Sequence, residues 1–228
     1  KKIKCNVHYR WPYLNLKNNV EKLIKEYDLG KPLSLLIHGG SGGLSTGGVH
    51  WMDFSRRLFN KEPLSVLSKL NINYINPRSP NLIYIDGICE FSFEDDQRLT
   101  FCLNNNSSIS LETRILFTHG YIDIDGKSIL KVFKRPENEI KLASKQITRY
   151  GIPQLVFQSE DLSGVSSLPK IVDEMLLSDN VSDICCDSMS GLIGSAMLIA
   201  ALESSKISTS LDLRNLLNIK CTENWLVS

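Results

Sequence analysis

Hydrophobic residues near the start of the chain recur at helical spacing and then gather in short apolar runs. Residues 18–27 place apolar side chains three and four positions apart, which predicts an amphipathic helix that Gly30 ends. Residues 33–37 form an apolar run that leads into His38, Gly39 and Gly40. This pattern is typical of a buried parallel strand that enters a tight glycine turn.

Three further apolar runs follow at residues 82–85, 128–133 and 154–157, and residues 137–150 have a helix-like pattern. Strands that alternate with helices favour a mainly parallel sheet that is covered on both faces. We therefore predict an α/β, Rossmann-like fold with a mostly parallel sheet and helices on both of its faces.

The pattern becomes helical after residue 168. Residues 171–177, 191–203 and 210–217 each predict a helix. The sequence therefore predicts a Rossmann-like domain over residues 1–168 and a small helical appendage over residues 169–228.

Composition narrows the class of protein. Hydrophobic residues make up 42% of the 228 positions, which is enough for a core, and 26 basic against 25 acidic residues leave a formal charge of +1. Any contact with nucleic acid must therefore come from a local basic patch. No membrane span or signal peptide is visible, and the start at Lys1 suggests a processed product or a fragment. The six cysteines form no C-x-x-C pair, which favours reduced thiols and no zinc site.

The glycine turn at residues 39–43 is the main candidate for chemistry. Glycines after a strand let the backbone pass close to a ligand, and backbone N–H groups there favour a phosphate or a carboxylate. The turn lacks the G-x-G-x-x-G frame of dinucleotide folds and the Gly-Lys-Ser/Thr of a P-loop. A flexible Gly/Ser loop without a ligand stays open as an alternative.

The residues around this turn resemble the FtsJ-like ribose 2′-O-methyltransferases, especially the version in the large polymerase proteins of non-segmented negative-strand RNA viruses. Their turn is of the type G-x-G-S-G-G, and residues 38–43 are similar, with His38 in place of the first Gly. The resemblance covers about residues 15–168. It implies S-adenosyl-L-methionine as the cofactor, held by His38, Gly39, Gly40, Ser41, Gly42 and Gly43.

The resemblance also implies four catalytic residues. Lys17 matches a Lys about twenty residues before the turn, Asp86 an Asp after the fourth strand, and Lys131 a Lys in a later strand. Where the family has a Glu before its last strand, this chain has Leu168, and Glu160 is the nearest carboxylate. We expect Lys17, Asp86 and Lys131 to converge beside a concave glycine turn, where a lysine near other cations is a usable base.

The implied activity is methylation of an RNA cap at the ribose 2′-O, or also at guanine N7, within a viral polymerase or capping protein. The expected partners are a capped RNA 5′ end and other domains of a larger viral protein, without a membrane. The expected location is the host cytoplasm or the virion. Local groups that could contact RNA are Arg10, Trp11, Tyr13, Arg56, Arg57, Lys134 and Arg135.

Three alternatives remain open. Asp187 and Lys220 also lie at the ends of strand-like runs and form a rival pair for the same chemistry. The departure at Leu168 allows a degenerate methyltransferase fold that serves as a scaffold or binding module. An α/β-hydrolase with Ser188 as the nucleophile is the third, although every histidine precedes Ser188, against the order of that family's triad.

Overall fold

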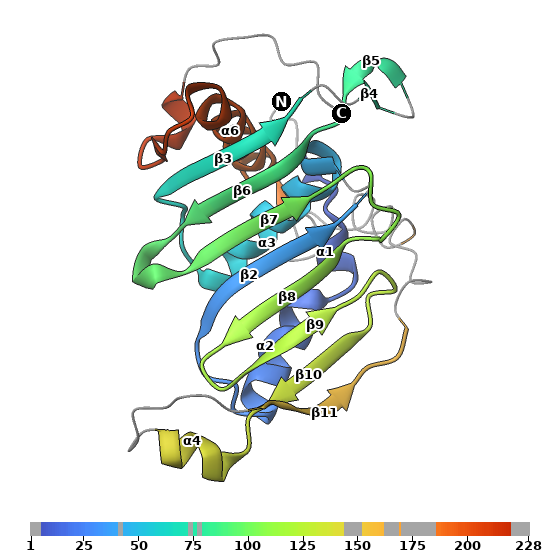
Figure 1. Ribbon diagram of the computed structural model, residues 1–228, viewed down its shortest axis with the longest axis vertical. Helices are drawn as coiled ribbons and strands as arrows, with labels where there is room; N and C mark the ends of the chain where they lie inside the picture. The colour runs from blue at the N-terminus through green and yellow to red at the C-terminus, as the bar shows by residue number, and fades with distance from the viewer. Residues whose placement is uncertain are drawn as a thin grey trace, which may run out of the picture.

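The computed structural model describes residues 6–40, 43–72, 75–76, 79–143, 152–161, 169 and 186–219. Its centre is one large twisted sheet of nine strands (Figure 1). Their order across the sheet is β11 (Gln154–Gln158), β10 (Leu130–Lys134), β9 (Gly120–Ile124), β8 (Glu112–Phe117), β2 (Pro32–Gly39), β7 (Arg98–Leu103), β6 (Asp86–Ser92), β3 (Ser65–Asn71) and β13 (Leu211–Asp212).

The hydrogen-bond pattern of this sheet differs from the expected one. β2 and β7 pair in parallel, and the other seven neighbouring pairs of described strands are antiparallel. Residues 93–97 join β6 to β7 and residues 118–119 join β8 to β9, and connections this short make antiparallel hairpins. The α/β class is confirmed, whereas the mostly parallel arrangement is wrong.

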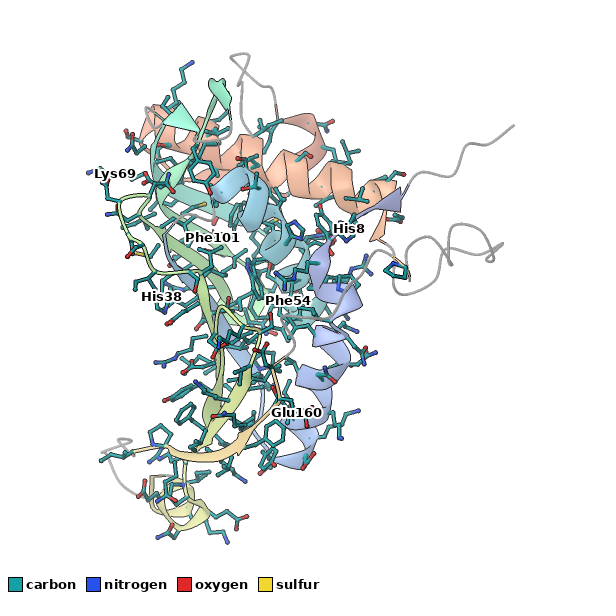
Figure 2. The ribbon with its side chains drawn as sticks, turned by 90° about the vertical axis from the view of Figure 1, so that its right-hand side faces the viewer. His8, His38, Phe54, Lys69, Phe101 and Glu160 are labelled. Carbon is teal, nitrogen blue, oxygen red and sulfur yellow. The ribbon has the colours of Figure 1, made fainter. Side chains whose placement is uncertain are left out.

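The three longest described helices lie on one face of the sheet, as the edge-on view in Figure 2 shows. The burial pattern of β8 records the same asymmetry, because Thr113, Ile115 and Phe117 are buried while the residues between them are exposed. Such an alternation is typical of an antiparallel sheet with one solvated face. The prediction of helices on both faces is therefore wrong for the described residues.

Four helices supply most of the cover: α1 (Arg10–Tyr13), α2 (Leu16–Glu26), α3 (Val49–Phe59) and α6 (Ser188–Ile207). Phe54 of α3 and Val20 of α2 are fully buried, as are Leu35 and Ile37 of β2. Each buried side chain of this size contributes about 1.5–3 kcal/mol to folding. The core therefore lies between the helices and the covered face of the sheet.

Smaller elements complete the described chain. The pairs β1 (Asn6–Val7) with β12 (Cys186–Asp187) and β4 (Ile75–Asn76) with β5 (Ser79–Ile83) form two short two-stranded sheets. A π-helix, η1, covers Gly43–Gly48, and 3-10 turns cover η2 (Glu94–Asp96) and η3 (Leu216–Asn218). Helix α4 (Glu137–Ala143) follows β10. No described helix has the length and hydropathy that a membrane span requires.

Most of the elements predicted early in the chain are confirmed. The predicted helix at residues 18–27 is α2, and the apolar run at 33–37 is β2, the fifth of the nine strands. The runs at 128–133 and 154–157 are β10 and β11. The run at 82–85 is confirmed as a strand only over Leu82 and Ile83, which end β5; β5 pairs with β4 outside the main sheet, and β6 begins at Asp86.

The last described segment joins the main sheet. β13 pairs with β3, and Leu213 N–H donates to Leu64 O at 2.8 Å. α6 packs on β3, where Ser68 N–H donates to Ser204 Oγ at 3.2 Å. The helix predicted at 191–203 is confirmed, and the one at 210–217 is wrong. The predicted helix at 171–177 lies outside the described residues, and the domain boundary at residue 168 stays a prediction.

Candidate functional site

A cavity of about 280 Å³ lies between helices α1 and α3 and the loops at one end of β8 and β9. Its wall is mostly apolar and includes two tryptophans, with a small number of polar groups among them. That combination is typical of sites that hold a small molecule. The lining residues are Arg10, Trp11, Leu14, Leu16, Gly47, His50, Trp51, Ser110, Leu111, Thr113, Ile124, Asp125, Gly126 and Ser128.

His50 is the imidazole in the wall of this cavity. Arg10 N–H donates to His50 Nδ1 at 2.9 Å, and the Tyr9 ring packs edge-on against the imidazole with centroids 5.2 Å apart. Burial, together with the neighbouring His8 and Arg10, lowers the pKa of His50 to about 4. The His50 ring is therefore neutral near pH 7.

His50 lies in the first turn of α3 because η1 leads directly into that helix. Gly48, at the junction, has helical angles of φ −63° and ψ −39°. A Cβ at Gly48 would stand 2.8 Å from Cδ1 of Leu44, which is fully buried. The glycine therefore allows the close packing on Leu44 that fixes where α3 begins.

The buried carboxylate of Asp53 on α3 positions Trp11, which lines the cavity. Asp53 is 0% exposed and accepts a hydrogen bond from Trp11 Nε1 at 3.1 Å. Arg56 Nη1 lies 3.4 Å from the same carboxylate, so the charge of Asp53 is paired. The Trp11 ring also packs edge-on against Phe54, with centroids 5.6 Å apart. These contacts hold Trp11 in one orientation against the cavity.

The turn between β9 and β10 closes another side of the cavity. Asp125 accepts hydrogen bonds from the backbone N–H of Lys127 at 3.0 Å and of Ile129 at 3.1 Å. Its carboxylate also lies 3.5 Å from Lys131 Nζ. The Asp125 carboxylate in the cavity wall is therefore already hydrogen-bonded within the turn and paired with Lys131.

The glycine turn predicted as the cofactor site packs against the protein's own loop. A Cβ at Gly39 or at Gly40 would fall under 3.0 Å from a carbonyl oxygen, that of Ser110 or that of Ser107 respectively. Gly40 N–H donates to Ile109 O at 2.8 Å. The close approach that these glycines permit is thus an approach between two segments of the chain.

The other described residues of the predicted cofactor site do not support cofactor binding either. His38 lies on the uncovered face of the sheet, 3.8 Å from the Glu112 carboxylate (Figure 2). Gly43 has a positive φ of 57° and begins η1, where a Cβ would fall under 3.0 Å from the Tyr84 ring. Ser41 and Gly42 lie outside the described residues. The cavity beside His50 is lined by η1 and α3 beyond this turn.

The predicted convergence of Asp86 and Lys131 is wrong. Asp86 begins β6 and Lys131 lies in β10, five positions away in the strand order, which corresponds to about 24 Å at ~4.8 Å per strand. Asp86 is buried and accepts a hydrogen bond from the backbone N–H of Asn105 at 2.7 Å. Lys131 pairs with Asp125. Both residues thus have structural partners of their own.

Lys17 and Glu160 do not join them. Lys17 lies in the first turn of α2 and pairs with Glu21 at 3.1 Å. Glu160 is exposed beyond the end of β11 (Figure 2). The four residues predicted as catalytic therefore lie on separate parts of the fold, because four strands separate β6 from β10 while Lys17 lies on α2 and Glu160 beyond β11.

The two alternative sites are also accounted for by local structure. Asp187 is the N-cap of α6 and accepts hydrogen bonds from the backbone N–H and the hydroxyl of Ser190, both at 2.8 Å. Ser188 is the exposed first residue of that helix. Lys220, the rival partner of Asp187, lies outside the described residues.

The basic groups expected to contact RNA are mostly engaged by the protein. Arg56 forms a bidentate ion pair with Glu62, and Arg57 donates to Ser190 Oγ at 2.9 Å. Arg10 and Trp11 line the cavity instead of forming an open stacking surface. Among the described residues, no group of His, Cys, Asp and Glu could hold a metal ion.

Comparison with known proteins identifies solved structures that have a similar fold. No family model and no curated protein matches the sequence. Several solved structures do match. The transcriptional regulator Gal80p from Kluyveromyces lactis has TM-score 0.66 and 12% identity over 95% of this chain and 64% of its own. An oxidoreductase from Agrobacterium radiobacter has TM-score 0.61 and 14% identity over 94% of this chain and 66% of its own. The aldose-aldose oxidoreductase of Caulobacter crescentus has TM-score 0.61 and 14% identity over 92% and 64%.

These similarities overturn the methyltransferase interpretation. The matching folds are those of oxidoreductases and of Gal80p, and the Agrobacterium radiobacter structure is a complex with NAD⁺, not with S-adenosyl-L-methionine. The assignments to RNA cap methylation and to a viral polymerase are therefore wrong. This chain spans about two thirds of the length of these three proteins.

Proposed function

We propose that this chain forms the substrate-holding part of an oxidoreductase-like protein and binds a small hydroxylated molecule in the cavity beside His50. The observation that carries the proposal is that cavity, which combines apolar walls with a neutral imidazole and hydroxyl groups. Its volume of about 280 Å³ is near the lower limit for small-molecule sites, so the ligand is small.

The ligands bound in two of the structural neighbours agree with this chemistry. The Agrobacterium radiobacter oxidoreductase is in complex with L-tartaric acid, and the Caulobacter crescentus enzyme with glycerol. Both molecules carry several hydroxyl groups. Thr113, Ser110 and Ser128 supply hydroxyl groups to the cavity wall here, and each can donate and accept a hydrogen bond.

The described residues do not fit a dinucleotide cofactor. A pyrophosphate needs available backbone N–H groups at a glycine turn between a strand and a helix. Here Gly40 N–H donates to Ile109 O at 2.8 Å and Leu44 N–H donates to Ile85 O at 3.0 Å. After α3 the chain enters β3, which pairs antiparallel with β6 instead of extending a parallel sheet. The role proposed for this chain is therefore to hold and orient the substrate.

Ligand titration tests the proposal. We would titrate the protein with glycerol, L-threitol, D-glucose and L-tartrate and follow tryptophan fluorescence, because Trp11 and Trp51 both line the cavity. At least one of these molecules is expected to give a saturable change, with calorimetry as the second readout. No saturable change with any of the four compounds would overturn the proposal.

A matched pair of variants locates the binding. Leu111→Phe enlarges a side chain that lines the cavity, whereas Ile109→Phe makes a similar change two positions away at an exposed side chain outside the lining. We expect Leu111→Phe to weaken binding at least tenfold and Ile109→Phe to leave it unchanged. Equal affinities in the two variants would place the ligand elsewhere and contradict the proposal.

A further inference from the structure

The hydrogen bond from Arg10 to His50 fixes the position of the imidazole proton. A backbone N–H can only donate, so Nδ1 of His50 must present a lone pair to it, at 2.9 Å. A neutral imidazole that is unprotonated at Nδ1 carries its proton at Nε2. While this bond is intact, His50 is a hydrogen-bond donor at Nε2 and has no second site at which to accept a proton.

The packing around the ring keeps this arrangement in place. The Tyr9 ring lies edge-on to His50 at an angle of 67°, and Tyr9 is itself buried. In the part of the chain that the structure describes, Nδ1 has the Arg10 amide as its partner and Nε2 has no hydrogen-bond partner. His50 lines the cavity, so its Nε2–H is the donor that this residue can offer to a ligand there.

The charge near this donor is positive. Arg10 is exposed at the cavity, and its guanidinium forms no ion pair with any described residue. Its charge is one of the effects that lower the pKa of His50, which places it close to the ring. Asp125 is the one carboxylate among the lining residues, and it is already engaged by Lys131 and by two backbone N–H groups. An unpaired cation beside a fixed donor favours an anionic acceptor.

We propose that the ligand of this cavity is a small hydroxylated carboxylic acid, whose carboxylate accepts from His50 Nε2–H and pairs with the Arg10 guanidinium. This inference rests on the proposed function only in using the same cavity. A carboxylate offers acceptors and no donor, which suits two donors on residues that line one cavity. His50 then acts as a positioning group that holds the acid, not as a base.

Two probes with the same carbon skeleton separate this inference from the proposed function. L-tartrate carries a carboxylate at each end where L-threitol carries a CH₂OH group. Hydrogen bonds to a charged partner are strong enough that we expect L-tartrate to bind about tenfold to hundredfold more tightly. Equal affinities would overturn the carboxylate inference and leave the proposed function standing.

Variants at the two donors test the roles of the residues. His50→Gln keeps an N–H donor near the position of Nε2, while His50→Asn is too short to do so, and His38→Ala on the uncovered face serves as the control (Figure 2). We expect the affinity for L-tartrate to fall less than about threefold in His50→Gln and tenfold or more in His50→Asn. Arg10→Gln keeps the backbone donor and should weaken L-tartrate tenfold but not L-threitol. Equal losses in His50→Gln and His50→Asn would overturn the donor role.

The position of the proton is observed directly in ¹⁵N–¹H spectra of histidine-labelled protein, where the His50→Gln variant identifies the His50 signals. We expect a neutral ring with its proton on Nε2 at pH 7. A proton on Nδ1, or a gain of L-tartrate affinity as the pH falls through 6.5, would show that a different form of His50 binds the acid and would contradict the inference.

Discussion

Replacing Gly39 with alanine separates a structural glycine from a cofactor-binding one. Gly39 has φ +132°, which L-residues rarely adopt, and such strain costs about 1–3 kcal/mol. The new Cβ would also lie under 3.0 Å from Ser110 O and 3.2 Å from Leu111 Cα. Overpacking of this kind costs about 1–3 kcal/mol more. We therefore expect Gly39→Ala to lower the free energy of unfolding by about 4 kcal/mol.

Urea unfolding followed by circular dichroism measures this change as a lower midpoint with an unchanged slope. For a chain of this length, about 4 kcal/mol corresponds to roughly 8–16 °C in melting temperature. Gly48→Ala is the comparison variant, since Gly48 has helical angles and its new Cβ adds only the clash with the Leu44 side chain, without backbone strain, so a smaller loss is expected. A Gly39→Ala protein as stable as the natural one would refute the reasoning, because the turn would then have room for a ligand.

Two further predictions concern the cavity and its supports. Asp53→Asn should lower the free energy of unfolding by about 3 kcal/mol in urea titrations, because it removes a buried charge that the half-buried Arg56 pairs with; a loss below 1 kcal/mol would contradict this. His50 has its pKa lowered from 6.5 to about 4, so the unfolded state binds the proton more readily. Stability should therefore fall as the pH drops from about 6.5 to 4, by up to about 3 kcal/mol, and His50→Gln should remove that part of the pH dependence.

The elements that the sequence predicts well are those whose burial follows from a single local pattern. Residues 18–27 form α2 because one apolar stripe faces the core, and residues 33–37 form β2 because a central strand is apolar over most of its length. β7 and β8 were missed. Their residues alternate between buried and exposed, which makes each run look polar when only continuous apolar runs are sought.

The wrong strand directions had a larger effect than the missed strands. In a parallel sheet the carboxyl ends of the strands meet at one edge, and that rule placed Asp86 and Lys131 side by side. In this sheet the neighbouring strands reverse direction except β2 and β7, and four strands lie between β6 and β10. A motif order that fits a parallel fold thus carries no spatial information here.

The candidate site could not be predicted from the sequence, for a different reason. His50 is paired with Arg10 through a backbone amide forty positions earlier, and a backbone donor leaves no trace in the residue type. The Gly47-Gly48 pair before α3 was the available signal, because glycines directly before a helix indicate a close approach at its start. The residues on either side of the cavity, Trp11 and Asp125, come from chain segments more than a hundred positions apart.

The arrangement of the fold explains why the cavity holds donors. The long helices cover one face of the sheet and α1 packs against α3, so the chain entering α1 brings a backbone N–H to the first turn of α3. That N–H occupies the side of His50 that a catalytic base would need free. The carboxylate that could have oriented the ring for base chemistry, Asp53, is instead committed to Trp11 and Arg56. The same contacts that build the cavity therefore make it a site that holds an acceptor oxygen, and they predict binding to carboxylates more than proton abstraction.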